Sequence, residues 1–155
     1  MKKIGVMLDS IGSSQISECV IDTFNSISLS ESDVDTIAFY KKHPTPPSTP
    51  LFSCMEQTEL WGYEGDVIAT SLDNAMTLTN ITGPRRKFFY VWDLEWARLT
   101  NTRYSYLESI YNNESLELIA RSDWHASLIS QYWKSPIATI KDFNDLDILS
   151  LCGEN

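Results

Sequence analysis

The sequence predicts an α/β protein with a Rossmann-like, three-layer arrangement around a mostly parallel sheet. Two short apolar runs, at 4–8 and 87–92, have the composition of strands that are buried on both faces, which is typical of parallel sheets. Segments with helical spacing of apolar residues follow several such runs, and this alternation predicts right-handed strand–helix–strand units. With 155 residues the chain has the usual length of one domain, so we expect a single domain over 1–155.

The first half of the chain supplies four of the expected strands. Ser13 or Ser14 is suited to cap a helix that begins at Gln15, whose apolar stripe is Ile16, Val20, Phe24 and Ile27. The proline-rich stretch 41–50 is expected to be a loop. The expected elements are strand 4–8, loop 9–14, the helix from 15, strand 34–40, strand 51–55, a brief helix 56–61, strand 66–71 and helix 72–80.

The second half continues the same alternation. Residues 87–92 form the clearest strand, because aromatic and β-branched residues follow one another without a break. Ser122 is expected to cap a helix over 123–133. The other expected elements are helix 102–111, strand 116–120 and a last strand over 136–140.

Composition excludes several classes of protein. A formal net charge of −9, with Arg85–Lys87 as the only tight basic cluster, does not suit binding to nucleic acid. No apolar run is long enough to span a membrane, and Asp9 interrupts the first run before it could act as a signal peptide, so we expect a cytoplasmic protein. The cysteines, Cys19, Cys54 and Cys152, are odd in number and far apart, which favours free thiols over disulfides or a zinc site.

Ligand-binding residues are expected in the loops that follow the strands. In parallel sheets ligands bind outside the carboxyl ends of the strands, where the strand order reverses. Gly12 allows close approach of a ligand to the backbone, with a simple turn residue as the alternative. The expected ligand-binding residues are Asp9, Ser10, Gly12, Ser13, Ser71 and Ser122.

Three residues are expected to take part in catalysis, if the protein is an enzyme. Asp93 and Glu95 follow the strand at 87–92 and are suited to act as a base, although Asp93 has the alternative of capping a helix. His125 falls in the first turn of a helix, where the dipole favours the neutral imidazole, with a plain surface histidine as the alternative. Neither G-x-G-x-x-G nor G-x-x-x-x-G-K-[ST] occurs, so we expect neither classical NAD binding nor nucleotide hydrolysis. We expect no cofactor and no bound metal.

The last third of the chain resembles the end of the N-terminal domain of GT-B-fold glycosyltransferases. The run from Leu116 to Ile129, continuing at Ser135–Ile140, is similar to that domain's strand, small residue and serine, following helix and final strand. The first strand and its glycine-containing loop resemble the part of the family that faces the donor diphosphate. Two features depart from the family: Lys141-Asp142-Phe143-Asn144-Asp145 replaces the usual Asn-Gly-[Val/Ile]-Asp, and the sequence has no counterpart of the second, donor-binding domain.

This resemblance implies a glycosyltransferase-like domain that forms the acceptor-side half of a sugar-transfer site and is not active alone. The alternative is a non-catalytic binding or regulatory module derived from such a domain, for example one encoded by a phage. The expected partners are a sugar nucleotide or sugar acceptor and a partner subunit or second copy of the chain. The sequence does not decide whether the protein is an enzyme.

Overall fold

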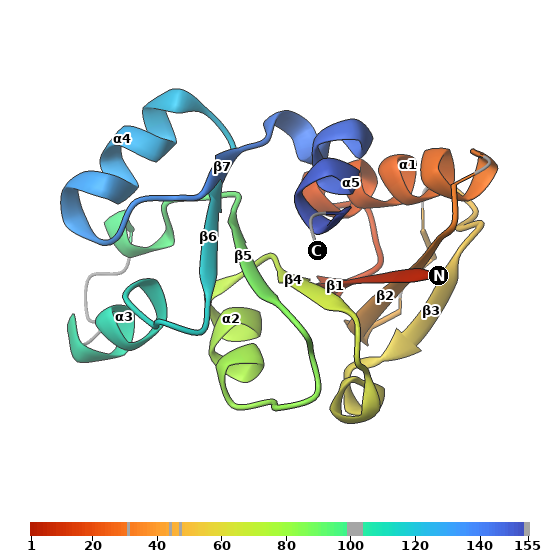
Figure 1. Ribbon diagram of the computed structural model, residues 1–155, viewed down its shortest axis with the longest axis horizontal. Coiled ribbons are helices and arrows are strands. Elements are labelled where there is room, and N and C mark those ends of the chain that lie inside the picture. Colours follow the sequence, from red (N-terminus) through yellow and green to blue (C-terminus); the bar gives the residue numbers. More distant parts are fainter. Residues whose placement is uncertain (31, 44, 47, 99–103, 154–155) are drawn as a thin grey trace.

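The computed structural model describes residues 1–30, 32–43, 45–46, 48–98 and 104–153. Seven strands form one all-parallel sheet in the order β3-β2-β1-β4-β5-β6-β7 (Figure 1). The predicted α/β class with a Rossmann-like three-layer arrangement is therefore confirmed. The strands are β1 (Lys2–Ser10), β2 (Val34–Lys42), β3 (Ser53–Glu56), β4 (Asp66–Ala69), β5 (Lys87–Val91), β6 (Glu117–Ala120) and β7 (Ala138–Thr139).

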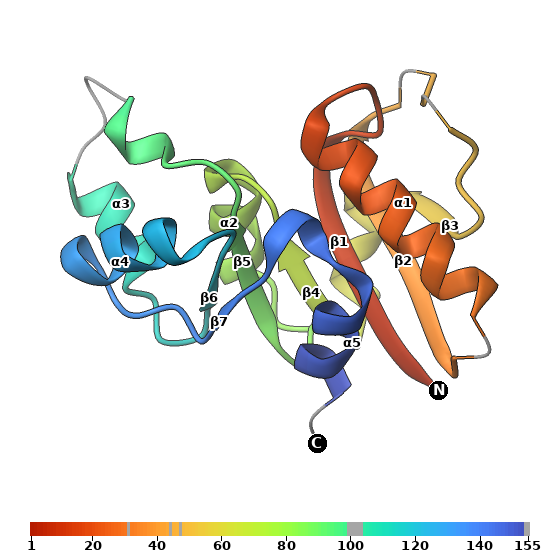
Figure 2. The same ribbon diagram turned by 90° about the horizontal axis from the view of Figure 1, so that it is seen from above.

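Helices cover both faces of this sheet. Figures 1 and 2 show α1 and α5 side by side over one face, and α2 and α3 over the other. The α-helices are α1 (Gln15–Leu29), α2 (Leu72–Thr79), α3 (Tyr104–Tyr111), α4 (Asp123–Tyr132) and α5 (Asp145–Gly153). Short 3₁₀ helices are η1 (Gln57–Gly62), η2 (Glu95–Ala97) and η3 (Lys141–Phe143). No helix in the described part of the chain combines the length and the apolar character that crossing a membrane requires.

The two faces of the sheet have separate apolar cores. Successive strand residues point to opposite faces, so Val6 packs with α1 and α5 whereas Met7 packs with α2 and α3. Both side chains are fully buried. The central strands thus carry the unbroken apolar runs that a sheet covered on both sides requires.

The strand order reverses between β1 and β4. From β1 the chain moves outward to β2 and β3, and from β4 it moves the other way to β7. In Figure 2, β1 runs from the N-terminus at the bottom to the loop before α1 at the top. Because all strands are parallel, the loops after every strand gather at this same edge, which we call the carboxyl edge.

The predicted elements before residue 140 correspond closely to the observed ones. Ser14 and Ser122 cap α1 and α4 as expected: the Ser14 side chain accepts from the N–H of Ser17, and the Ser122 side chain from that of His125. Helix α3 begins at Tyr104, and positions 102–103 of the predicted helix lie outside the described residues. Helix α5 was not predicted.

Two arginines hold the end of α5 against the sheet. Arg86 donates to the carbonyl oxygen of Leu151 at 3.0 Å, and Arg85 to that of Cys152 at 3.5 Å. Arg85 also donates two hydrogen bonds, of 2.8 and 2.7 Å, to the buried carboxylate of Asp66 at the start of β4. Cations near a helix C-terminus stabilise its free carbonyl groups, so α5 depends on residues far away in the sequence.

Gly65 lies where a side chain has no room, and Gly65→Ala is expected to destabilise the protein by about 1–3 kcal/mol. A Cβ at this position would come within 2.6 Å of both the backbone oxygen of Lys3 and the ring of Tyr63. Urea denaturation measures the effect, and Gly62→Ala is the matched control. A Cβ at Gly62 meets nothing within 4 Å, so that variant should stay within about 0.5 kcal/mol of the parent. Equal midpoints for the two variants would contradict this assignment.

Candidate functional site at the carboxyl edge

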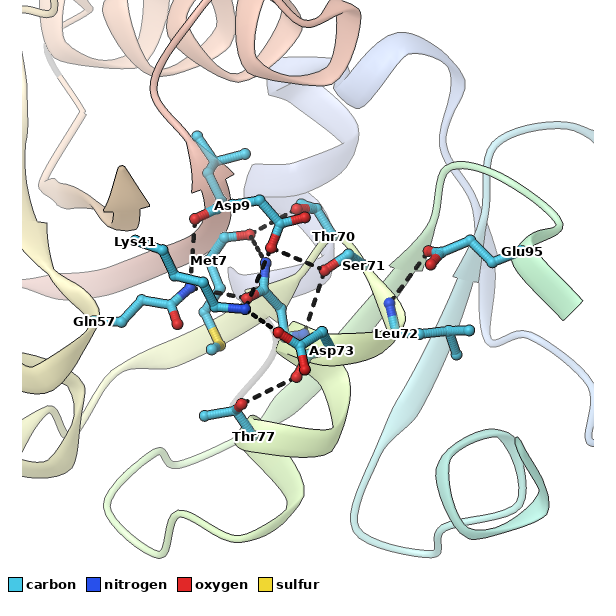
Figure 3. Close-up of polar contacts among 12 residues, drawn as sticks. Met7, Asp9, Lys41, Gln57, Thr70, Ser71, Leu72, Asp73, Thr77 and Glu95 are labelled. Carbon is cyan, nitrogen blue, oxygen red and sulfur yellow. Dashed lines mark hydrogen bonds and ion pairs between the residues drawn. The ribbon is translucent and has the colours of Figure 1, made fainter. Parts of the chain in front are cut away.

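The loops at the strand reversal carry a charged cluster, which we call the switch-point cluster: Asp9, Lys41, Ser71, Asp73 and Glu95. Figure 3 shows Lys41 reaching from the end of β2 between two carboxylates. Its ammonium group pairs with Asp73, and with Asp9 at 3.4 Å. Burial lowers the pKa of Lys41, but hydrogen bonds and charges of these aspartates outweigh burial and raise the pKa above its ordinary value. Lys41 is therefore a permanent cation here.

Buried amide and hydroxyl groups fix the end of β1 beneath this cluster. The hydroxyl of Thr70 donates to the carbonyl oxygen of Met7 at 2.6 Å, and the amide of Asn74 donates to the same oxygen at 3.3 Å. Gln57 joins Asn74 to β1 by donating to the Asn74 side chain at 2.8 Å and to the carbonyl oxygen of Leu8 at 3.3 Å. Asn74 is fully buried, so this network sets the position of the loops above it.

The N-terminus of α2 is already occupied by groups of the protein itself. Ser71 caps the helix, and the carboxylate of Glu95 accepts from the N–H of Leu72 at 3.2 Å (Figure 3). Burial, followed by the charges of Asp9 and Asp93, raises the pKa of Glu95, although the Leu72 hydrogen bond opposes this. A phosphate at this helix end would have to displace Glu95 and approach three carboxylates, so the switch-point cluster does not favour anions.

The first loop contributes Ser10, Gly12 and Ser13, three of the predicted ligand-binding residues. Ser10 is the last residue of β1, and the N–H of Gly12 donates to the buried hydroxyl of Ser17 at 3.1 Å. Gly12 is itself buried, whereas Ser13 is exposed. The loop is thus closed on α1 by its own hydrogen bonds, and the serines at 13 and 14 are exposed.

A second group of polar residues surrounds an open pocket of about 580 Å³ beside the ends of β6 and β7. We call it the β6–β7 pocket. Figure 1 shows α4 starting near β7, from which the chain continues to α5 beside α1. Its lining consists of Arg121, Ser122, Asp123, His125, Thr139, Lys141, Asp142 and Asp147. A volume of this size is typical of small-molecule sites.

Arg121 is held in a fixed position at this pocket. Its guanidinium carbon lies 4.0 Å from the ring centroid of Trp92, and one N–H donates to the backbone oxygen of Trp92 at 3.3 Å. Cation–π contact and hydrogen bond together orient the planar group. None of the ion pairs between described residues involves Arg121 or Lys141, although three aspartates line the same pocket.

The opposite wall of the pocket is a backbone turn in an unusual conformation. Asp142 and Phe143 have φ values of 50° and 56°, in the left-handed region that side chains rarely adopt. The hydroxyl of Tyr90 donates to the carbonyl oxygen of Ile140 at 2.6 Å and accepts from the N–H of Phe143 at 3.2 Å. Thr23 donates to the Phe143 carbonyl oxygen at 2.6 Å. Buried contacts thus impose this conformation on the turn that carries Lys141 and Asp142.

His125 and Ser122 form a pair at the start of α4. The Ser122 hydroxyl oxygen lies 2.6 Å from His125 Nδ1. Burial and then the charge of Arg121 lower the pKa of His125, although Asp93 opposes them, so the imidazole is neutral near pH 7. Asp93 itself forms an ion pair with Arg98. The neutral imidazole of His125 can accept a proton or a hydrogen bond from a bound hydroxyl group.

The predicted site residues therefore fall into three places along one edge. Asp9, Ser71 and Glu95 lie in the switch-point cluster, and Ser10, Gly12 and Ser13 in the first loop. Ser122 and His125 line the β6–β7 pocket, with Asp93 close enough to affect the pKa of His125.

Sequence reasoning did not select Lys41, Arg121, Lys141 or Asp142. Each follows or ends a strand, as Asp9 and Ser71 do, so the same rule applied to every strand end would have included them. The expected site residues include carboxylates, serines, a glycine and a histidine but no lysine or arginine, which is why the three cations are missing from them.

No family model, curated protein or solved structure matches this chain. Among the described residues no group of three histidine, cysteine or acidic side chains is placed to hold a metal ion. The fold defines the class: this is a Rossmann-like three-layer α/β protein with polar loops at one edge. Its function has to be inferred from the geometry of that edge.

Proposed function

We propose that this protein binds a sugar-like, hydroxyl-rich ligand in the β6–β7 pocket. The observation that carries the proposal is the pocket lining, where three carboxylates, two cations, a serine, a threonine and a neutral histidine line a volume of about 580 Å³. Hydroxyl groups of a sugar both donate and accept hydrogen bonds, and carboxylates can only accept. A ligand with several hydroxyl groups therefore matches this lining better than an apolar one.

The pocket is consistent with the acceptor side of a sugar-transfer site. His125, neutral and next to Ser122, is a group that can accept a proton from an acceptor hydroxyl. The sugar-transfer role and the non-catalytic binding module share the same ligand class, and both stay predictions. Steady release of nucleotide from a sugar nucleotide in the presence of a bound acceptor, lost in His125→Gln, would favour catalysis.

Asp142→Asn is expected to weaken sugar binding by about fivefold to tenfold, because an uncharged amide accepts hydrogen bonds from hydroxyl groups less strongly than a carboxylate. Asparagine tolerates the left-handed backbone at this position, so the fold should be retained. Amide chemical shifts in NMR titrations with hexoses and disaccharides measure the affinity and locate the site.

The matched control is Asp22→Asn, which removes the same charge from an exposed position of α1 outside the pocket. This variant should bind sugars like the parent. Shift changes confined to residues away from 121–125 and 139–147, or the absence of sugar binding, would contradict the proposed function.

A further inference from the structure

We propose that the β6–β7 pocket takes a phosphorylated sugar-like ligand, with Arg121, Lys141 and the first turn of α4 holding its phosphate group. This inference rests on the proposed function, because it assigns the anionic part of the same ligand. It is carried by two cations that line one pocket without a carboxylate partner.

Arg121 provides the fixed half of the phosphate site. Guanidinium has five N–H donors, and the hydrogen bond to the Trp92 backbone uses one of them. The guanidinium carbon lies over the ring of Trp92, and the Trp92 backbone oxygen is the acceptor that Arg121 has among the described residues. Arginine held in this way can donate two parallel hydrogen bonds to a phosphate.

Lys141 and α4 complete the positive side. Lys141 lines the same pocket from the left-handed turn, whose backbone Tyr90 and Thr23 hold in place. Helix α4 has ten residues, and its first-turn N–H groups lack acceptors within the helix apart from the Ser122 cap. The positive end of the helix dipole thus lies at the pocket beside the two cations.

The carboxylates of Asp123, Asp142 and Asp147 decide which anion fits. Inorganic phosphate would be attracted by the two cations of the pocket but repelled by its three carboxylates, so it would bind weakly. A neutral sugar would satisfy the carboxylates but leave the cations without a partner. A ligand that carries both hydroxyl groups and a phosphate satisfies both parts of the lining, which is why we assign a phosphorylated sugar.

The experiment compares glucose-6-phosphate, glucose and inorganic phosphate as ligands of the intact protein. We expect the sugar phosphate to bind at least tenfold more tightly than either of the other two. The chain has two histidines, so proton NMR titration reports the pKa of each. Phosphate next to Arg121 should raise the pKa of His125, whereas His43, outside the pocket, should not respond.

Lys141→Gln should weaken binding of glucose-6-phosphate by about tenfold and binding of glucose by much less, because the lost charge faces the phosphate group. The matched control is Lys42→Gln, at an exposed position at the end of β2, which should have no effect beyond that of net charge. Equal losses of affinity for glucose-6-phosphate in the two variants would mean that only the net charge of the protein matters, and would overturn the inference.

The ligand comparison separates the two proposals. If glucose binds in the pocket and its phosphate adds no affinity, the phosphate site is wrong and the sugar site stands. If inorganic phosphate binds as tightly as the sugar phosphate, the assigned ligand class is wrong. If none of the three ligands binds or changes the pKa of His125, both proposals fail.

Discussion

Val6→Asp is expected to abolish the folded state at room temperature or to lower its urea midpoint drastically. Val6 is fully buried in the middle of β1, with β2 on one side and β4 on the other. An aspartate there would place an unpaired carboxylate among apolar side chains, which costs several kcal/mol. Typical domains have only about 5–15 kcal/mol of total stability.

Circular dichroism and urea denaturation measure this effect. Lys3→Ser, at an exposed position of the same strand, is the control and should change the free energy of unfolding by no more than about 0.5 kcal/mol. A midpoint for Val6→Asp equal to that of the parent would mean that β1 is not in the interior of the sheet.

Arg85→Met is expected to destabilise the protein by about 3–5 kcal/mol, because it removes the partner of a buried charge. The Asp66 side chain is 1% exposed, and both of its oxygens accept hydrogen bonds from Arg85. Without the arginine both oxygens of this carboxylate lose their hydrogen bonds, although the side chain lies in the interior. Thermal or urea unfolding gives the change in free energy.

Arg86→Met is a matched comparison from the next position in the chain. Arg86 donates two similar hydrogen bonds to Glu117, but that carboxylate is 34% exposed and can be hydrated once the arginine is lost. We expect a smaller loss of unfolding free energy, about 1–2 kcal/mol. Part of this loss comes from the hydrogen bond between Arg86 and the end of α5. Adding Asp66→Asn to Arg85→Met should restore at least half of the stability. If Asp66→Asn restores no stability to Arg85→Met, the buried charge is not the cause of the loss. Equal losses of unfolding free energy in the two arginine variants would also contradict the role assigned to burial.

Most of the fold could be predicted because local signals agree with it. The strands at 4–8 and 87–92 are apolar on both faces, and Ser14 and Ser122 cap helices as their positions suggest. Helix α5 has a capping residue, since the Asn144 side chain accepts from the N–H groups of Leu146 and Asp147, but its apolar pattern is weak. Leu146 is exposed whereas Ile148 and Cys152 are buried, so its apolar residues do not mark one clear face. Its position depends on Arg85 and Arg86, and long-range contacts of this kind leave no pattern within α5 itself.

The site was partly predictable for a similar reason. The rule for parallel sheets places Asp9, Ser71 and Ser122 at one edge from sequence alone. It cannot show that Glu95 turns back onto the N-terminus of α2, or that Trp92 supports Arg121, because both are contacts between separate loops. The left-handed turn at Asp142 was also hidden, since glycine usually marks such a conformation and none is present there.

The two outer strands of the sheet are short, and this bears on aggregation. β3 has four residues and β7 has two, whereas β1 and β2 in the interior have nine each. An outer strand offers its unpaired N–H and C=O groups to any other extended chain, and a short one offers few of them. Parallel sheets form slowly because their contacts are distant in sequence, so partly folded chains persist for longer. Ending the sheet in such brief strands limits strand-to-strand association between copies during that time.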